Sequence, residues 1–210
     1  MMERKSSDEE FLKKPRRKVA GAAVLQPSVT ASLHRALFEE WAEAGYASLR
    51  MERIAARAGV GKAALYRRWK TKRDMAYEAV ETTALTITPV PDTGTLADDV
   101  HAITRAFAVV LRHRLVRRIL PDLHAERARS DELDALLDKV TKGRRAQAAV
   151  VLEHAIERGD ISAGVDRQLA LDMLLAPLYW STIVQRRHLR TAEIKRIAEL
   201  ALLSIRNVSC

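Results

Sequence analysis

The residue types best suited to chemistry lie in one short cationic segment, residues 62–69. On a helix that turns by 100° per residue, Ala63, Ala64 and Arg67 face away from the apolar Leu65. An arginine can pair bidentately with O6 and N7 of guanine, and an alanine methyl group can touch the methyl group of thymine. The outward face of this segment is therefore predicted to read base edges in the major groove of duplex DNA.

The side chains around this face are better suited to phosphate groups, which position a helix without reading sequence. The free N–H groups at the start of the next predicted helix, near Thr71, also favour an anion. The predicted phosphate contacts are Arg50, Lys62, Tyr66, Arg68, Thr71 and Lys72.

The elements that must position this segment have the pattern of a helix-turn-helix. A short helix from Met51 ends at Gly59, a residue free to take a positive φ. Val60 is predicted to fill the gap between the two helices. The second helix is predicted to be held inward by Leu65 and Trp69, four residues apart.

Net charge favours a polyanionic partner for the same part of the chain. The 210 residues hold 36 Lys and Arg against 27 Asp and Glu, a formal charge of +9. Residues 1–80 hold 17 of these basic residues and 10 of the acidic ones, which leaves only +2 for residues 81–210. Such asymmetry suggests nucleic acid or an anionic membrane as the partner. The alternative is a basic surface that only aids solubility.

The rest of the chain is predicted to be helical throughout, because no run alternates like a strand. Capping boxes at Thr71–Asp74 and Thr95–Asp98 open helices, and Ser130, Asp166 and Thr191 are expected to cap three more. The expected later helices span about 96–115, 116–128, 131–158, 166–187 and 191–206. The fold class is all-α with about nine helices. The predicted domains are a disordered basic tail (1–26), a helix-turn-helix domain (27–88) and a larger helical domain (92–210).

Several function classes are excluded by what the sequence lacks. A single cysteine, Cys210, rules out a disulfide framework and a cysteine-based zinc site. No window has the roughly 18 apolar residues of a membrane span, and no signal peptide is apparent. Histidines lie on different predicted helices without metal spacing. We expect a cytoplasmic protein that is not an enzyme and needs no cofactor or metal.

A longer pattern resembles the N-terminal domain of TetR-family transcriptional repressors over residues 31–80. It comprises Ala36-Leu-Phe, Trp41, Gly45-Tyr46, Ile54-Ala55, Ala58-Gly59-Val60, Leu65-Tyr66, Trp69 and Lys72. The resemblance implies a dimeric repressor that a ligand releases from DNA. The chain departs from the family where Leu49-Arg50 replaces a usual Ser or Thr, and where Gly61 replaces a usual Ser.

The resemblance also implies a dimer interface in the last two helices, which form a four-helix bundle with those of a partner in this family. An alternative is that the same side chains form the chain's own core. The expected dimer residues are Met173, Ala176, Tyr179, Ile183, Ile194, Ile197, Leu200 and Ala201.

A ligand pocket is likewise expected among the middle helices, and an apolar lining with few polar groups suggests a hydrophobic or aromatic effector. The alternative is that these side chains only form core, which is the more usual role of a stripe of leucine and valine. The candidate pocket residues are Phe107, Leu111, Leu115, His124, Gln147, Leu174, Leu178 and Trp180, with Arg127 and Arg144 as further polar anchors.

Together these observations predict a sequence-specific DNA-binding transcriptional regulator. We expect a homodimeric repressor that a small hydrophobic effector releases from a palindromic operator, with no membrane partner. The alternative is a helical scaffold or membrane-surface protein without sequence-specific DNA binding. Sequence preference for duplex DNA distinguishes the two.

Overall fold

The computed structural model describes residues 27–84 and 90–208, which form nine α-helices and no strand. The all-α prediction is therefore confirmed for these residues, and the predicted tail, residues 1–26, lies outside them. The helices are α1 (Pro27–Ala44), α2 (Met51–Ala58), α3 (Lys62–Arg68), α4 (Lys72–Ala84), α5 (Leu96–Arg112), α6 (Val116–Arg127), α7 (Asp134–Glu157), α8 (Arg167–Tyr179) and α9 (Thr191–Asn207).

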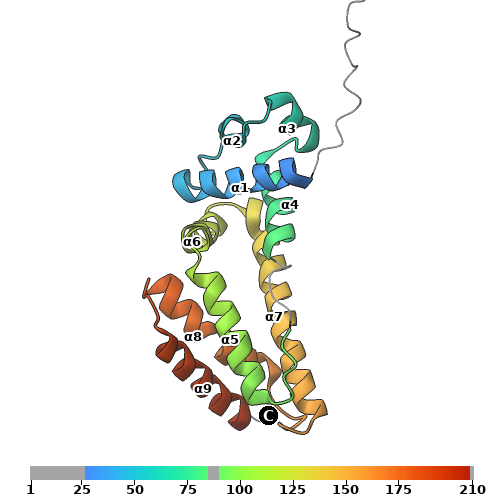
Figure 1. The fold of residues 1–210 in the computed structure, drawn as a ribbon, viewed down its shortest axis with the longest axis vertical. Coiled ribbons are helices and arrows are strands. Elements are labelled where there is room, and N and C mark those ends of the chain that lie inside the picture. Colours follow the sequence, from blue (N-terminus) through green and yellow to red (C-terminus); the bar gives the residue numbers. More distant parts are fainter. Residues whose placement is uncertain (1–26, 85–89, 209–210) are drawn as a thin grey trace, which may run out of the picture.

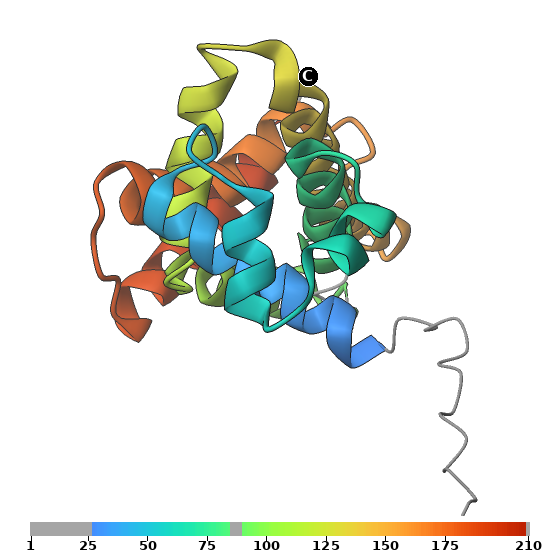
Figure 2. The ribbon, with the colours of Figure 1, turned by 90° about the horizontal axis from the view of Figure 1, so that it is seen from above.

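The helices form two groups that follow one another along the long axis of the molecule (Figure 1). Helices α1 to α3 form one end, and α5, α7, α8 and α9 run side by side towards the other. Helix α6 lies between these groups and packs against both α1 and α5. Viewed from above, α1, α2 and α3 lie across the ends of the remaining helices (Figure 2).

Local sequence explains where the N-terminal helices stop and start. Gly45 ends α1 with φ of +79°, and Gly59 ends α2 with φ of +67°. These left-handed conformations are accessible to glycine without strain. The predicted capping box of α4 is present, since Thr71 Oγ1 accepts from the Asp74 N–H at 3.1 Å and Asp74 Oδ2 accepts from the Thr71 N–H at 3.2 Å.

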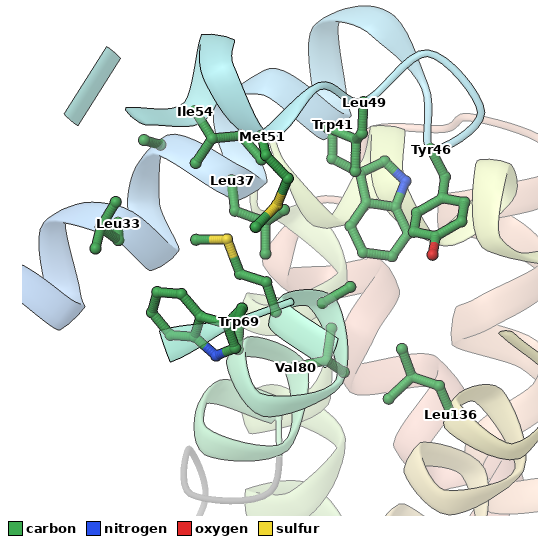
Figure 3. Close-up of a cluster of buried hydrophobic side chains, with 14 of the residues drawn as sticks. Leu33, Leu37, Trp41, Tyr46, Leu49, Met51, Ile54, Trp69, Val80 and Leu136 are labelled. Atoms are coloured by element: carbon green, nitrogen blue, oxygen red, sulfur yellow. The ribbon is translucent and has the colours of Figure 1, made fainter. Parts of the chain in front are cut away.

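One apolar core holds the N-terminal helices together (Figure 3). Leu37 and Trp41 of α1 lie beside Ile54 of α2 and Trp69 at the end of α3. The same core continues into the second half of the chain, because Leu136 of α7 belongs to it, as do Leu123, Leu133 and Leu137. The N-terminal helices therefore share their core with parts of α6 and α7, and the domain boundary near residue 90 stays a prediction.

Two predicted helix starts are wrong. The Ser130 side chain makes no capping bond, and a 3₁₀ turn, Asp131–Leu133, precedes α7. Thr191 is the first residue of α9 and not its cap. Arg190 is the cap residue, and its N–H donates to the Glu193 carboxylate at 2.9 Å, as in a capping box. The cap at Asp166 is confirmed by its bond to the Leu169 N–H at 3.0 Å.

Helix α8 is shorter than the sequence predicts. It ends at Tyr179 and continues as one π-helical turn, Trp180–Val184, instead of reaching residue 187. Pro177 lies inside α8 and has no N–H to donate to the preceding turn. The missing N–H of Pro177 interrupts the regular pattern of backbone hydrogen bonds. The π-helical turn that follows has i→i+5 bonds in place of the i→i+4 bonds of an α-helix.

Candidate nucleic-acid interface

Helices α2 and α3 meet in a tight turn that exposes one face of α3. The Val60 N–H donates to the Ala55 carbonyl at 2.9 Å and so closes the turn around Gly59. Leu65 is fully buried and Trp69 is almost so. The predicted inward pair is thus confirmed, and the opposite face of α3 is directed outward at the end of the molecule (Figure 1).

The outward face carries the residues predicted to read bases. Ala63 and Arg67 are exposed, and Ala64 is half-buried. Within the described residues, no hydrogen bond or ion pair holds the Arg67 guanidinium. Lys62 at the start of α3 is also exposed and has no such partner there. Two cations beside small side chains are therefore available to an external ligand.

Arg68 is exposed, but bonds to two other helices of the domain hold its guanidinium. Its guanidinium donates to Glu78 Oε1 at 2.5 Å and to the Thr30 hydroxyl, and it lies 4.6 Å above the Trp69 ring. The same Glu78 carboxylate accepts from Trp69 Nε1 at 2.9 Å. Arg68 therefore braces the end of α3 against α4 and α1, and the predicted phosphate contact would compete with these bonds.

Tyr66 lies on the flank of α3 and is paired with an acid of α2. Its hydroxyl donates to Glu52 Oε1 at 2.7 Å. This bond raises the pKa of the Tyr66 hydroxyl and lowers the pKa of the Glu52 carboxyl. The bond fixes α3 relative to α2 and keeps the tyrosine neutral. The Tyr66 hydroxyl can therefore donate to a phosphate oxygen only if its bond to Glu52 breaks.

Lys72, the first residue of α4, lies at the edge of the candidate interface. Its Nζ donates to the carbonyls of Tyr46 at 2.9 Å and Ala47 at 3.0 Å, and lies 4.5 Å above the Tyr46 ring. This ammonium therefore holds the α1–α2 turn as well as carrying positive charge. Thr71 caps α4, and Arg50 is exposed at the start of α2, with no side-chain capping bond.

A further set of polar bonds, which sequence reasoning missed, joins this end to α6 and to the 3₁₀ turn before α7. The Asp122 carboxylate of α6 accepts from the Tyr46 N–H at 2.8 Å. The Tyr46 hydroxyl donates to Glu132 at 2.7 Å. Burial of the Tyr46 hydroxyl, together with this bond, strongly raises the pKa of Tyr46. The partners lie 76 and 86 positions apart, so no local pattern announces them.

The candidate pocket residues are scattered. Phe107 and Gln147 line a cavity of about 30 Å³ between α5, α7 and α8. Leu111, Leu174 and Leu178 are buried in the core, and Leu115 is half-buried after α5. His124 lies edge-on to the Tyr179 ring, at 5.8 Å between centroids. Trp180 does not line the cavity, because 57% of its surface is exposed on the outside.

The candidate dimer residues also separate into two groups. Leu200 and Ala176 are exposed, and Met173, Tyr179 and Ile197 are half-buried. Ile183, Ile194 and Ala201 are buried in the chain's own core, which leaves them little surface for a partner. The exposed apolar surface of this region also contains side chains that the sequence did not single out for a dimer, namely Leu169, Val184 and Leu203.

Two features are absent from the described residues. None of their helices combines the length and the apolar character that crossing a bilayer requires. Among the same residues, no group of three or more His, Cys, Asp or Glu is arranged to hold a metal ion.

Comparison with known proteins agrees with this geometry. Residues 33–79 match the model of bacterial regulatory proteins of the tetR family, and residues 90–201 match that of the Tetracyclin repressor-like C-terminal domain. The uncharacterized HTH-type transcriptional regulator YdeS of Bacillus subtilis is 27% identical over 144 residues, which cover 68% of this chain and 72% of YdeS.

Solved structures show the same likeness. The TetR family transcription regulator SCO0332 is 31% identical, with a TM-score of 0.57 over 85% of this chain and 98% of that one. FadR from Bacillus subtilis, in complex with stearoyl-CoA, shares the fold at 18% identity, with a TM-score of 0.63 over 86% and 99% of the two chains. The scaffold or membrane-surface alternative is not favoured. The chain belongs to the TetR family and is a DNA-binding transcriptional regulator.

Proposed function

We propose that two copies of this chain bind a palindromic operator as a repressor and that a small effector releases them. The observation that carries this proposal is the exposed Arg67, which stands beside Ala63 on the face of α3 opposite the buried Leu65. A guanidinium with no partner among the described residues can make the bidentate contact with guanine that specifies a base pair.

Exposed apolar side chains of α9 and of the π-helical turn after α8 support the dimer. Trp180, Leu200 and Leu203 are 57%, 64% and 57% exposed. Large contiguous apolar patches on a monomer mark interaction sites. Pairing of α8 and α9 with their copies would cover these side chains in a four-helix bundle. To reach successive major grooves of a palindrome, the two recognition helices of such a dimer must lie about 34–36 Å apart.

Release by an effector is supported by the position of α6. This helix packs against both α1 and α5, so a ligand among the middle helices has a direct route to the DNA-binding end. A structural relative, FadR, holds stearoyl-CoA, which is a precedent for a small-molecule ligand in this fold. If the ligand prefers a conformation in which the recognition helices are misplaced, DNA must weaken ligand binding by the same factor. The chain then acts by binding and not by catalysis.

The test is a mobility-shift assay at moderate salt with DNA from upstream of the chain's own gene and with scrambled duplexes. Wild-type protein should shift the upstream fragment preferentially. Arg67→Ala should reduce that preference, while Arg105→Ala, which removes the same charge from α5, should keep it in full. Equal shifts of all duplexes by the wild type would contradict the proposal.

A further inference from the structure

The cation at the end of α3 is held from three sides. Arg68 is the last residue of α3 and follows Arg67 directly. Its guanidinium donates to Glu78 Oε1 of α4 at 2.5 Å and to the Thr30 hydroxyl of α1, and it lies 4.6 Å above the Trp69 ring. Its side chain is 29% exposed. These contacts fix a cation at the edge of the face that is proposed to meet DNA.

The carboxylate of Glu78 has one charged partner. Its Oε2 accepts from the neutral indole Nε1 of Trp69 at 2.9 Å. His34 Nε2 lies 3.7 Å from Glu78 Oε1, which is beyond hydrogen-bonding distance. Burial lowers the pKa of the His34 imidazole, so this histidine is neutral at pH 7. Among the described residues, Arg68 is therefore the cation that balances the charge of Glu78.

The other cations of α3 are not held in this way. Lys62 and Arg67 are exposed, and within the described ranges no ion pair holds either side chain. A carboxylate and a phosphate each offer a guanidinium a pair of acceptor oxygens at similar spacing. Glu78 therefore occupies the donors of Arg68 that a backbone phosphate of DNA would take.

We infer that Glu78 is a specificity-determining residue, which withholds Arg68 from the DNA backbone and uses it to fix the last turn of α3. A phosphate contact strengthens binding to every sequence, and each contact adds about 0.9 to the slope of log K against log salt. The base contact proposed for Arg67 depends on the direction of the same helical turn. This inference rests on the proposed reading of bases by α3.

The test measures binding to the upstream fragment and to a scrambled duplex by fluorescence anisotropy, between about 50 and 200 mM salt. Glu78→Gln removes the charge, and its amide oxygen can still accept from Trp69 Nε1. The slope on the scrambled duplex should steepen by about 0.9, which makes the gain in affinity about threefold larger at the lower salt than at the higher. An unchanged slope would overturn the inference.

The same variant should also bind with less sequence preference. Glu78→Gln weakens the tie between α3 and α4, so the last turn of α3 holds Arg67 in a less constant direction. The ratio of the two affinities, upstream fragment over scrambled duplex, should fall at every salt concentration. A ratio equal to that of the wild type would contradict the role of Glu78 in specificity.

Removal of an acid near DNA also weakens general repulsion, and an Arg68→Ala background separates this effect. If Glu78 acts by holding Arg68, then Glu78→Gln should leave the slope of the Arg68→Ala protein unchanged. An equal steepening of the slope in both backgrounds would show a general charge effect and would overturn the inference.

Two further variants control for charge and for packing. Glu81→Gln makes the same charge change on α4, where Glu81 pairs with Lys139 of α7, and should keep the wild-type slope. Trp69→Phe removes the indole bond to Glu78 but keeps the pair of Glu78 with Arg68. It should lower the melting temperature without steepening the slope. A slope as steep in Trp69→Phe as in Glu78→Gln would assign the effect to loosened packing and overturn the inference.

The salt slope on the scrambled duplex does not depend on any sequence preference. Wild-type protein that binds all duplexes equally contradicts the proposed function, while a steeper slope in Glu78→Gln still shows that Glu78 withholds Arg68. Clear preference by the wild type, with one slope for both proteins, contradicts this inference alone.

Discussion

Asp122 of α6 accepts a hydrogen bond from the indole Nε1 of Trp41 of α1 at 2.7 Å, across 81 positions of sequence. The same carboxylate oxygen also accepts from the Tyr46 N–H. Gly45 leaves room for it, because a Cβ there would lie 3.2 Å from Asp122 Oδ1. One carboxylate of the second half of the chain thus holds the turn that leads into α2.

Asp122→Ala should lower the free energy of unfolding by about 2–3 kcal/mol, because the indole and a backbone N–H lose a charged acceptor. Urea denaturation measures this. Asp138→Ala is the matched control. Asp138 accepts from Arg127 at 3.1 Å, and the two side chains are 47% and 45% exposed. An exposed pair of this kind contributes about 0–1 kcal/mol. Equal losses in the two variants would contradict the role of Asp122.

Lys72→Met should weaken binding to every duplex by a similar factor and lower stability by about 1–2 kcal/mol. The reason is that its ammonium ties the carbonyls of Tyr46 and Ala47 to α4, which fixes the start of the helix-turn-helix. Fluorescence anisotropy on operator and scrambled duplexes, with thermal melting alongside, measures both effects. A loss confined to one base pair would show instead that Lys72 reads sequence.

Asp99 predicts a distinct loss of stability in acid. It is fully buried, and burial alone would raise its pKa. Bonds from Thr93 and from Arg158 at 2.8 Å outweigh burial and lower the pKa below its ordinary value. A depressed pKa in the folded state gives stability that is complete above the unfolded value of about 3.9. This stability is lost as pH falls through the folded pKa.

Asp99→Asn should therefore lower the free energy of unfolding by about 1–3 kcal/mol at neutral pH, because Thr93 and Arg158 lose a charged acceptor while Arg158 keeps its bonds to Asp92 and Asp160. The difference from wild type should shrink below about pH 4, because the carboxyl of the unfolded wild-type chain becomes protonated there and the folded one follows at lower pH. Urea denaturation as a function of pH gives both values. A constant difference down to pH 2 would show that Asp99 keeps no pKa shift of its own.

Leu200→Asp should convert the proposed dimer to monomer, because it places a charge where an exposed leucine of α9 would be covered by the partner copy. Sedimentation velocity measures the mass. Val109→Asp is the control, since Val109 of α5 is also exposed, at 69%, and is not among the residues proposed for the interface. If both variants sediment as the wild type does, α8 and α9 do not form the interface.

The sequence predicted those features that depend on neighbouring residues. The ends of α1 and α2 follow from Gly45 and Gly59, and the register of α3 follows from the spacing of Leu65 and Trp69. It predicted helix faces in the second half of the chain but not their partners. Ile194 is an example. The spacing of apolar residues around it indicates an apolar helix face, but the spacing does not show whether that face packs against the chain's own core or against a second copy.

The contacts that join distant segments had no local signal. Asp122 follows a proline in an otherwise ordinary helix, and nothing nearby indicates that Trp41 is its partner. Val90 and Pro91 carry the composition of a linker, and the sequence predicted a boundary there. In the structure the same two residues form the wall of a cavity, because tertiary packing and not composition decides what a connection covers.

Selection of duplexes from a randomised library by the full chain tests the central claim most directly. The account predicts enrichment of a palindrome whose half-sites lie about one helical turn apart. Arg67→Ala should lose the preference at one base pair in each half-site, with the rest of the motif retained. Enrichment of no sequence by the wild type, or an identical motif with Arg67→Ala, would contradict the assignment of α3 as the element that reads DNA.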